Sequence, residues 1–211
     1  LTRSSAASDV YKRQDKPPQK KFSRSYQSGP LSFEYFLDGV KIITNSGFGC
    51  NISKKAELLS RLTACQSTLT INDTSITKFE KNEMISKIFG ISIQDSFKSF
   101  DISSSNESHF ISCSAWNNGY EKIFGCTHKR KIYLDKENNY LKGTDHIFKA
   151  KDGYPIRYSF RFHVNPDLSV VKTMSGNSAL IQISKNKSLI FTVHNENLEI
   201  DKSIFLGEKK K

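Results

Sequence analysis

The side chains that could carry chemistry are spread thinly along the sequence. Five histidines occur at wide spacings: His109, His128, His146, His163 and His194. No two of them have the i, i+4 spacing that places two metal ligands on one face of a helix. No serine lies in the G-x-S-x-G motif that exposes the nucleophile of many hydrolases. Spacing alone therefore indicates neither a metal centre nor a nucleophilic hydrolase, and we expect no metal and no cofactor.

The cysteines are equally scattered, at Cys50, Cys65, Cys113 and Cys126. None forms a C-x-x-C pair, which argues against a zinc knuckle and against a redox motif. An even number leaves room for two disulfides in an oxidising compartment. Free cysteine is commonly a small buried hydrophobic residue, so four buried thiols are the favoured alternative.

The net charge of +11 lies partly in the two ends of the chain. Residues 1–24 carry seven Lys or Arg and two acids, and residues 208–211 carry three Lys and one Glu. Residues 25–207 hold 22 basic and 18 acidic residues, a net charge of +4. This near balance argues against nucleic acid as partner, because such an interface needs a basic face with interleaved aromatic residues. A mildly basic body still suits a polyanionic ligand, and no apolar run is long enough to span a bilayer.

Short alternating segments separated by turn residues dominate the sequence. Residues 31–37 alternate apolar and polar positions, Asp38-Gly39 supplies hairpin turn chemistry, and residues 40–45 return as the partner strand. Residues 54–62 are the one helical candidate. The expected strands are 31–37, 40–45, 67–73, 109–116, 120–126, 130–135, 140–150, 156–164, 168–173, 179–184, 188–193 and 198–206. This pattern predicts an all-β protein, a large antiparallel β-sandwich with at most one short helix.

Composition divides the chain into four parts. Residues 1–14 have no periodicity and look like a translated adaptor, so we expect a non-native leader there. Residues 15–24 are rich in proline and lysine, which predicts an exposed linker. Residues 25–207 contain the expected strands and form the sandwich domain, and residues 208–211 are a basic tail.

Several short motifs follow one another in a recognisable order. The chain reads SYQSGPLSFE at 25–34, ITNSG at 43–47 and ACQSTL at 64–69, and later pieces include HKR at 128–130, LKGTD at 141–145 and RFH at 161–163. Together they resemble the heparinase II/III-like family. The sandwich domain of that family opens with a pattern close to H-x-H-A-G/D-x-L-S-F-E, followed by V-D/N-x-G and A-H-S/N-T-L. The resemblance spans about residues 22–207.

The resemblance implies a fragment of a two-domain polysaccharide lyase, with an acidic polysaccharide as partner. An N-terminal α/α toroid, missing from this sequence, would carry the Asn, Tyr and His that start β-elimination on a uronate sugar. The sandwich would form one wall of the cleft, so the chain alone is not expected to be catalytic. The family also implies a periplasmic or cell-envelope location, and some members bind a metal in the sandwich through His and Asp.

The chain departs from the family at the positions that would carry proton transfer or metal. The two histidines of the opening motif are replaced by Ser25 and Gln27, the strand-end Asp by Asn45, and the later His by Gln66. Amides form hydrogen bonds but neither exchange protons near neutral pH nor bind zinc well. We therefore expect no metal, and a polar cluster that holds the strand entry in place.

The candidates for contact with a sugar or with the partner domain are Tyr26, His128, Arg130, Arg161 and His163. Arginine suits carboxylate or sulfate because its guanidinium can donate two parallel hydrogen bonds. For residues 161–163, an ordinary strand with alternating faces is the favoured explanation. A second functional hypothesis stays open, in which the chain is a non-catalytic carbohydrate-binding or structural module of an inactive lyase relative.

Overall fold

A computed structural model describes residues 8–12, 18, 22–80, 82–94, 97–149 and 156–207. Its strands are β1 (Ser8–Lys12), β2 (Phe33–Leu37), β3 (Val40–Thr44), β4 (Leu69–Ile71), β5 (Ser99–Asn106), β6 (Phe110–Asn117), β7 (Cys126–Asp135), β8 (Tyr140–Lys149), β9 (Tyr158–Phe160), β10 (His163–Val164), β11 (Ser169–Lys172), β12 (Ser178–Ser184) and β13 (Lys187–Thr192). They form antiparallel sheets with the orders β1-β2-β3-β10, β4-β9, β5-β6-β7-β8 and β11-β12-β13.

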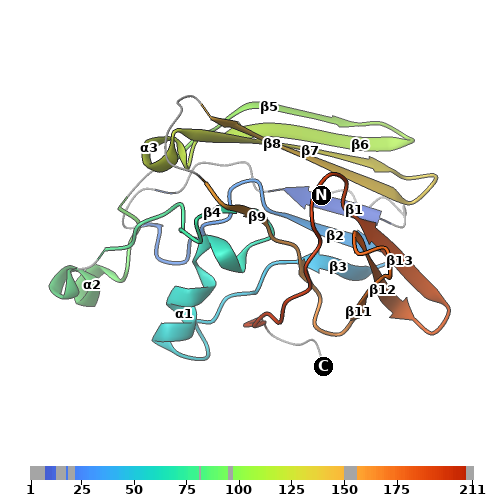
Figure 1. Ribbon diagram of the computed structural model, residues 1–211. Coiled ribbons are helices and arrows are strands. Elements are labelled where there is room, and N and C mark those ends of the chain that lie inside the picture. The colour runs from blue at the N-terminus through green and yellow to red at the C-terminus, as the bar shows by residue number, and fades with distance from the viewer. Residues whose placement is uncertain are drawn as a thin grey trace.

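Figure 1 shows the β5–β8 sheet as one layer, the β1–β3 strands beneath it, and β11–β13 at one end. The predicted all-β antiparallel sandwich is confirmed.

The hairpin of β2 and β3 has the tight turn that Asp38-Gly39 predicts. Asp38 and Gly39 have φ values of 51° and 78°, and two consecutive left-handed residues define a type I′ turn. β2 buries alternate residues, Phe33, Tyr35 and Leu37. The hairpin therefore presents one apolar face to the β5–β8 layer, as the alternation predicts.

The β5–β8 sheet has an inner face set by β7. Its buried residues alternate along the strand: Cys126, His128, Arg130, Ile132 and Leu134. β5 is less regular. Its register with β6 shifts between Phe100 and Ser103, where Asp101 has a φ of 49°, so the strand carries a bulge.

The predicted strand 156–164 is split between two sheets. Its first part, β9, pairs with β4, and its second part, β10, pairs with β3. Between them, the backbone N–H of Arg161 donates to the carbonyl of Thr68 at 3.0 Å. The segment thus ties the entry of β4 to the end of β3.

The helical elements of the described residues connect the strands; they are α1 (Lys54–Ser60), the 3₁₀ turn η2 (Thr63–Cys65), α2 (Glu83–Phe89) and α3 (Glu121–Phe124). α1 lies within the predicted helix, and the Ser53 hydroxyl caps it by accepting from the backbone N–H of Ala56. α2 and α3 have no counterpart among the predicted helices. None of the helices in the described part of the chain is long and apolar enough to span a membrane.

Two predicted strands are wrong. Residues 120–126 contain α3, which ends at Gly125 in the left-handed conformation, with a φ of 66°. Residues 198–206 form no strand and add no ladder to a sheet. The backbone N–H of Leu206 donates to the Ser46 carbonyl at 2.5 Å, and Ser203 contacts the ring of His163.

Parts of the predicted leader and linker contribute to the fold. β1 comes from the segment set apart as leader and pairs with β2 over five residues. Ser23, in the expected linker, is buried, and its hydroxyl accepts from the backbone N–H of Ile93 at 2.9 Å. The expected basic tail, residues 208–211, lies outside the described residues.

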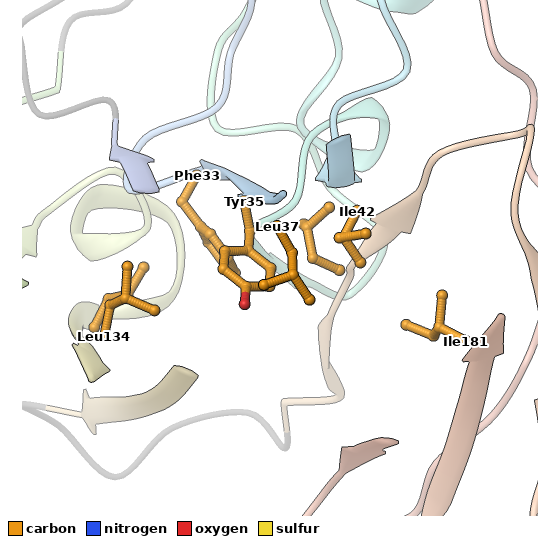
Figure 2. Packing of buried hydrophobic residues seen from close by; sticks show 8 residues of the cluster. Phe33, Tyr35, Leu37, Ile42, Leu134 and Ile181 are labelled. Atoms are coloured by element: carbon orange, nitrogen blue, oxygen red, sulfur yellow. The ribbon is translucent and has the colours of Figure 1, made fainter. Parts of the chain in front are cut away.

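The core consists of two hydrophobic clusters. The larger one contains Phe33, Tyr35, Leu37, Ile42, Ile43, Ile132, Leu134 and Ile181. Figure 2 shows side chains of β2 lying between Leu134 of β7 on one side and Ile181 of β12 on the other. The smaller cluster contains Leu69, Ile71, Ile76, Phe97, Tyr120 and Cys126. β7 contributes to both clusters, which makes it the central strand of the fold.

Shortening Leu134 tests this packing. Leu134 is fully buried, so Leu134→Ala removes apolar contacts and leaves a cavity, and we expect a loss of about 2–5 kcal/mol in the free energy of unfolding. Leu59→Ala is the matched control, because Leu59 is 40% exposed. Urea denaturation of both variants measures the difference, and equal losses would contradict the assignment of the core.

Candidate functional site

A buried ionic centre lies between the two clusters. On the inner face of β7, Cys126 belongs to the smaller cluster and Ile132 to the larger one. His128 and Arg130 occupy the alternate positions between them and are only 5% and 1% exposed. Their common partner is Asp145 on β8, directly opposite Arg130 in the register. Strand periodicity therefore directs both basic side chains into the protein.

Arg130 uses its whole guanidinium inside the fold. Its Nε and Nη2 donate to the two oxygens of Asp145 at 2.7 and 3.0 Å. Its Nη1 donates to the carbonyls of Leu31 at 3.1 Å and Ser67 at 2.8 Å. The guanidinium also lies near the Phe33 ring, 5.4 Å from its centroid. Arg130 thereby joins the β5–β8 sheet to the segments that lead into β2 and β4.

The electrostatics of this centre keep Asp145 ionised. His128 Nε2 donates to the Asp145 carboxylate at 2.6 Å. Burial raises the pKa of Asp145, but the charge of Arg130 and the hydrogen bonds from His128 and Arg130 outweigh it. The pKa of Asp145 therefore lies well below its ordinary value. Such a pair tolerates burial because its charges and hydrogen bonds are matched. The burial of His128 and Arg130 argues against the contact with a sugar or partner domain expected for them.

The amides at the family's His and Asp positions bond to the backbone. Gln27 Nε2 donates to the carbonyl of Gly47 at 2.8 Å. The side-chain oxygen of Asn45 accepts from the backbone N–H of Ser67 at 2.8 Å. Gln66, which is fully buried, donates to the carbonyl of Ser60 at 3.0 Å. Each amide thus fastens one segment near the end of β3 to another.

His163 lies in the same region and is held in one tautomer. Its Nε2 lies 3.0 Å from the carbonyl of Ala64, so Nε2 carries the proton, because a carbonyl can only accept. Nδ1 then accepts from the hydroxyl of Ser203 at 3.1 Å and lies 3.4 Å from that of Ser46. Burial lowers the pKa of His163; the bond to Ala64 opposes this, and the charge of Arg161 adds to it. The ring is therefore neutral near pH 7.

The remaining candidates differ in exposure. Tyr26 is half-buried, its ring packs near Phe97, and its carbonyl accepts from Arg61. Ser25 is exposed. The side chain of Arg161 is 35% exposed and pairs with Asp73 at 3.3 Å. Of the basic candidates, Arg161 is the one whose charge remains accessible to an external ligand.

Sequence reasoning missed a second buried arginine. Arg61, at the end of α1, is 1% exposed and donates to three carbonyls, those of Ser23, Tyr26 and Ile91. Burial lowers its pKa, and the nearby charge of Glu57 opposes this. Because the acceptors are backbone groups far apart in sequence, no motif could have revealed the role of Arg61.

The donor set near the end of β3 does not fit a zinc ion. The family's metal-binding members use His and Asp, whereas this chain offers the amides of Gln27, Asn45 and Gln66. Neutral amide oxygens are poor zinc ligands compared with imidazole, thiolate or carboxylate. Within the described residues, no three His, Cys, Asp or Glu side chains gather closely enough to hold a metal.

The fold and the region near the end of β3 define a class of protein. It is an antiparallel β-sandwich domain in which buried polar side chains hold the segments that lead into β2 and β4. The family model described as heparinase II/III-like, C-terminal matches residues 10–211. The chain belongs to the heparinase II/III-like family, and the match is to the C-terminal domain of that family.

Solved structures with the same fold are much longer than this chain. A mutant heparan sulfate lyase from Pedobacter heparinus is 14% identical, with a TM-score of 0.60 over 81% of this chain and 24% of that protein. A heparinase III with methylated lysines is 15% identical, with a TM-score of 0.54 over 74% of this chain and 21% of that protein. Another heparinase III is 16% identical, with a TM-score of 0.54 over 78% and 22%. The chain thus spans about a quarter or less of their length. No curated protein sequence matches it.

Removing the acid of the ionic centre should destabilise the fold. Asp145→Asn leaves Arg130 buried without its counter-charge, so we expect a loss of about 3–5 kcal/mol in the free energy of unfolding. Because the folded-state pKa of Asp145 is depressed, its stabilisation is complete above the unfolded pKa of about 4 and is lost as the pH falls further. Urea denaturation between pH 7 and pH 2 measures both effects. The exposed Asp201→Asn serves as control, and an equal effect of the two changes would refute the buried pair.

The state of His163 can be read by nitrogen NMR. We expect the Nε2–H tautomer at pH 7 and a titration midpoint below about 6.5, the value for an unperturbed histidine. Because the folded-state pKa is lowered, the neutral ring contributes stability above about pH 6.5 and loses it as the pH falls. The same ring in the urea-unfolded chain is the reference. A midpoint above that of the unfolded chain, or an Nδ1–H tautomer, would contradict the hydrogen bonds described.

Proposed function

We propose that this chain is the C-terminal sandwich of a polysaccharide lyase that cleaves acidic, uronate-containing polysaccharide by β-elimination. The observation that carries the proposal is the family match over residues 10–211. Lyase fold relatives, including one that acts on heparan sulfate, support it. A bacterial periplasm or cell envelope, where such polysaccharide is met, is the proposed location.

Beta-elimination needs proton-transfer groups, and amides occupy the positions at which the family places two of its histidines in this domain. A positioned base must remove the proton beside the sugar carboxylate, and an acid must protonate the leaving oxygen. Gln27 and Gln66 stand at the family's His positions and cannot transfer protons near neutral pH. His163 has both ring nitrogens engaged within the fold. In this proposal an N-terminal α/α toroid supplies the proton chemistry, and the sandwich supports it and forms a wall of the cleft.

The same amides favour a second candidate, a non-catalytic carbohydrate-binding or structural module of an inactive lyase relative. The hydrogen bonds of Gln27, Asn45 and Gln66 fasten backbone segments, and that role needs no catalysis. A carbohydrate-binding module would share the ligand class of the lyase and differ from it in forming no product, and a structural module would do neither.

The deciding experiment uses the natural protein with its upstream region restored from the genomic locus. The protein is incubated with heparan sulfate, polygalacturonate and a neutral glucan, and the ultraviolet absorbance of unsaturated sugar products is followed. We expect new absorbance with an acidic polysaccharide and none with the glucan. Retained binding without absorbance on any substrate would support the inactive relative instead.

Alanine variants then separate positioning from proton transfer. Loss of a general acid or base typically costs about 10²–10⁴-fold in rate. We expect Gln27→Ala to change kcat by less than about tenfold, since an amide contributes no proton transfer. A larger loss in kcat, in a variant that circular dichroism shows to be folded, would place Gln27 in the catalytic machinery.

A further inference from the structure

The outer face of the β5–β8 sheet carries rings and lysines rather than only small polar groups. Because β7 buries alternate residues, its other residues face outward. Directly opposed residues share a face, so the register assigns the neighbouring strands as well. The outward residues are Phe100, Ser103, Ser105, Phe110, Ser112, Ser114, Trp116, Thr127, Lys129, Lys131, Tyr133, Asp135, Tyr140, Lys142, Thr144, His146 and Phe148. Figure 1 shows this sheet as an outermost layer, with the β1–β3 strands on its inner side.

The rings on this face hold one lysine in place. The Phe100 and Trp116 rings stack at a centroid distance of 6.2 Å and an interplanar angle of 5°. The ammonium of Lys129 lies 5.2 Å from the Trp116 centroid, a cation–π arrangement. Phe110 and Tyr133 form a second stack, 5.5 Å apart. The result is a charged group pre-positioned on a rigid sheet instead of a lysine free in solvent.

The charge of the face is one-sided. Lys129, Lys131 and Lys142 face outward, and the one carboxylate that the register assigns to this face is Asp135, beside the β7–β8 turn. Within the described part of the chain, neither Lys131 nor Lys142 forms an ion pair. Lys129 and Lys131 are about 7 Å apart along β7, and Lys142 lies opposite Tyr133 on β8. An extended chain of negative charges could therefore meet three cations in succession.

We propose that this outer face is a second binding surface for an acidic polysaccharide chain, separate from the region near the end of β3. Serine and threonine hydroxyls occupy the middle of the face and suit the hydroxyls and acidic groups of sugars. Exposed rings, Tyr140 at 54% and Phe148 at 60%, offer apolar surface to the C–H faces of pyranoses. The ligand class rests on the proposed function; the location rests on the register and on the three lysines.

A glycan fits this face better than a single-stranded nucleic acid. Nucleic-acid platforms use free aromatic faces on which successive bases stack. Here Phe100 and Lys129 pack against Trp116, and Phe110 packs against Tyr133, so these rings already stack on protein groups. Lysines beside hydroxyl groups remain as the recognition elements, and they match a sulfated or carboxylated sugar chain.

The test uses the 211-residue chain and the fluorescence of Trp116, the single tryptophan in the sequence. Heparan sulfate oligosaccharide is titrated into the protein at low salt, with polygalacturonate, neutral glucan and single-stranded DNA in parallel. We expect saturable changes in Trp116 emission with the acidic glycans and none with the glucan. The triple variant Lys129→Gln, Lys131→Gln, Lys142→Gln should bind at least tenfold more weakly.

A charge-matched variant separates this face from net charge. Lys54→Gln, Lys55→Gln, Lys172→Gln removes the same three charges from exposed positions on α1 and β11, and we expect it to bind within twofold of the unchanged chain. Equal losses in the two triple variants would mean diffuse attraction and would overturn the proposal, as would tighter binding of DNA than of glycan. If the 211-residue chain bound no glycan, the proposed binding surface would be overturned, even if the longer protein formed a lyase product. Binding lost in the first variant alone would support this face even if the longer protein proved inactive.

Discussion

The pairing of Arg130 with Asp145 is the interaction on which the rest of the sandwich depends. It neutralises charge at the point where two apolar clusters meet along β7. Arg130 also reaches the carbonyl of Leu31, a buried residue with a φ of 56° that is uncommon for a side chain of this size. Without the guanidinium, that carbonyl would lose its donor in a dry environment, which costs more than a hydrogen bond contributes when made.

Ser67 connects this ionic centre to the region that carries the family motifs. Its carbonyl accepts from Arg130, its backbone N–H donates to Asn45, and its hydroxyl donates to the carbonyl of Thr44 and accepts from the N–H of His163. One small residue therefore couples β7, the end of β3 and the start of β10. The amides at the family's His and Asp positions add further hydrogen bonds to backbone groups in the same region.

Periodicity and turn chemistry predict the strands well, and they fail where a partner lies far away in sequence. The alternation of 31–37 and Asp38-Gly39 predict the β2–β3 hairpin because both signals are local. Residues 120–126 are also predicted as a strand, yet they contain α3, which ends at Gly125 in a left-handed conformation. His128 and Arg130 resemble surface residues in a charged run. In the structure both side chains are buried and bond to Asp145, a partner that no short-range pattern assigns to them.

The bulge at Asp101 has a consequence for how the domain behaves at high concentration. Among the described strands, β5 and β8 form the two edges of the β5–β8 sheet, and an open edge can recruit a strand from another molecule. The bulge interrupts the regular row of backbone donors and acceptors along β5, so a second chain cannot extend the ladder in register there. The bulge therefore disfavours edge-to-edge pairing at β5, whereas β8 pairs with β7 in an unbroken register and is a regular edge.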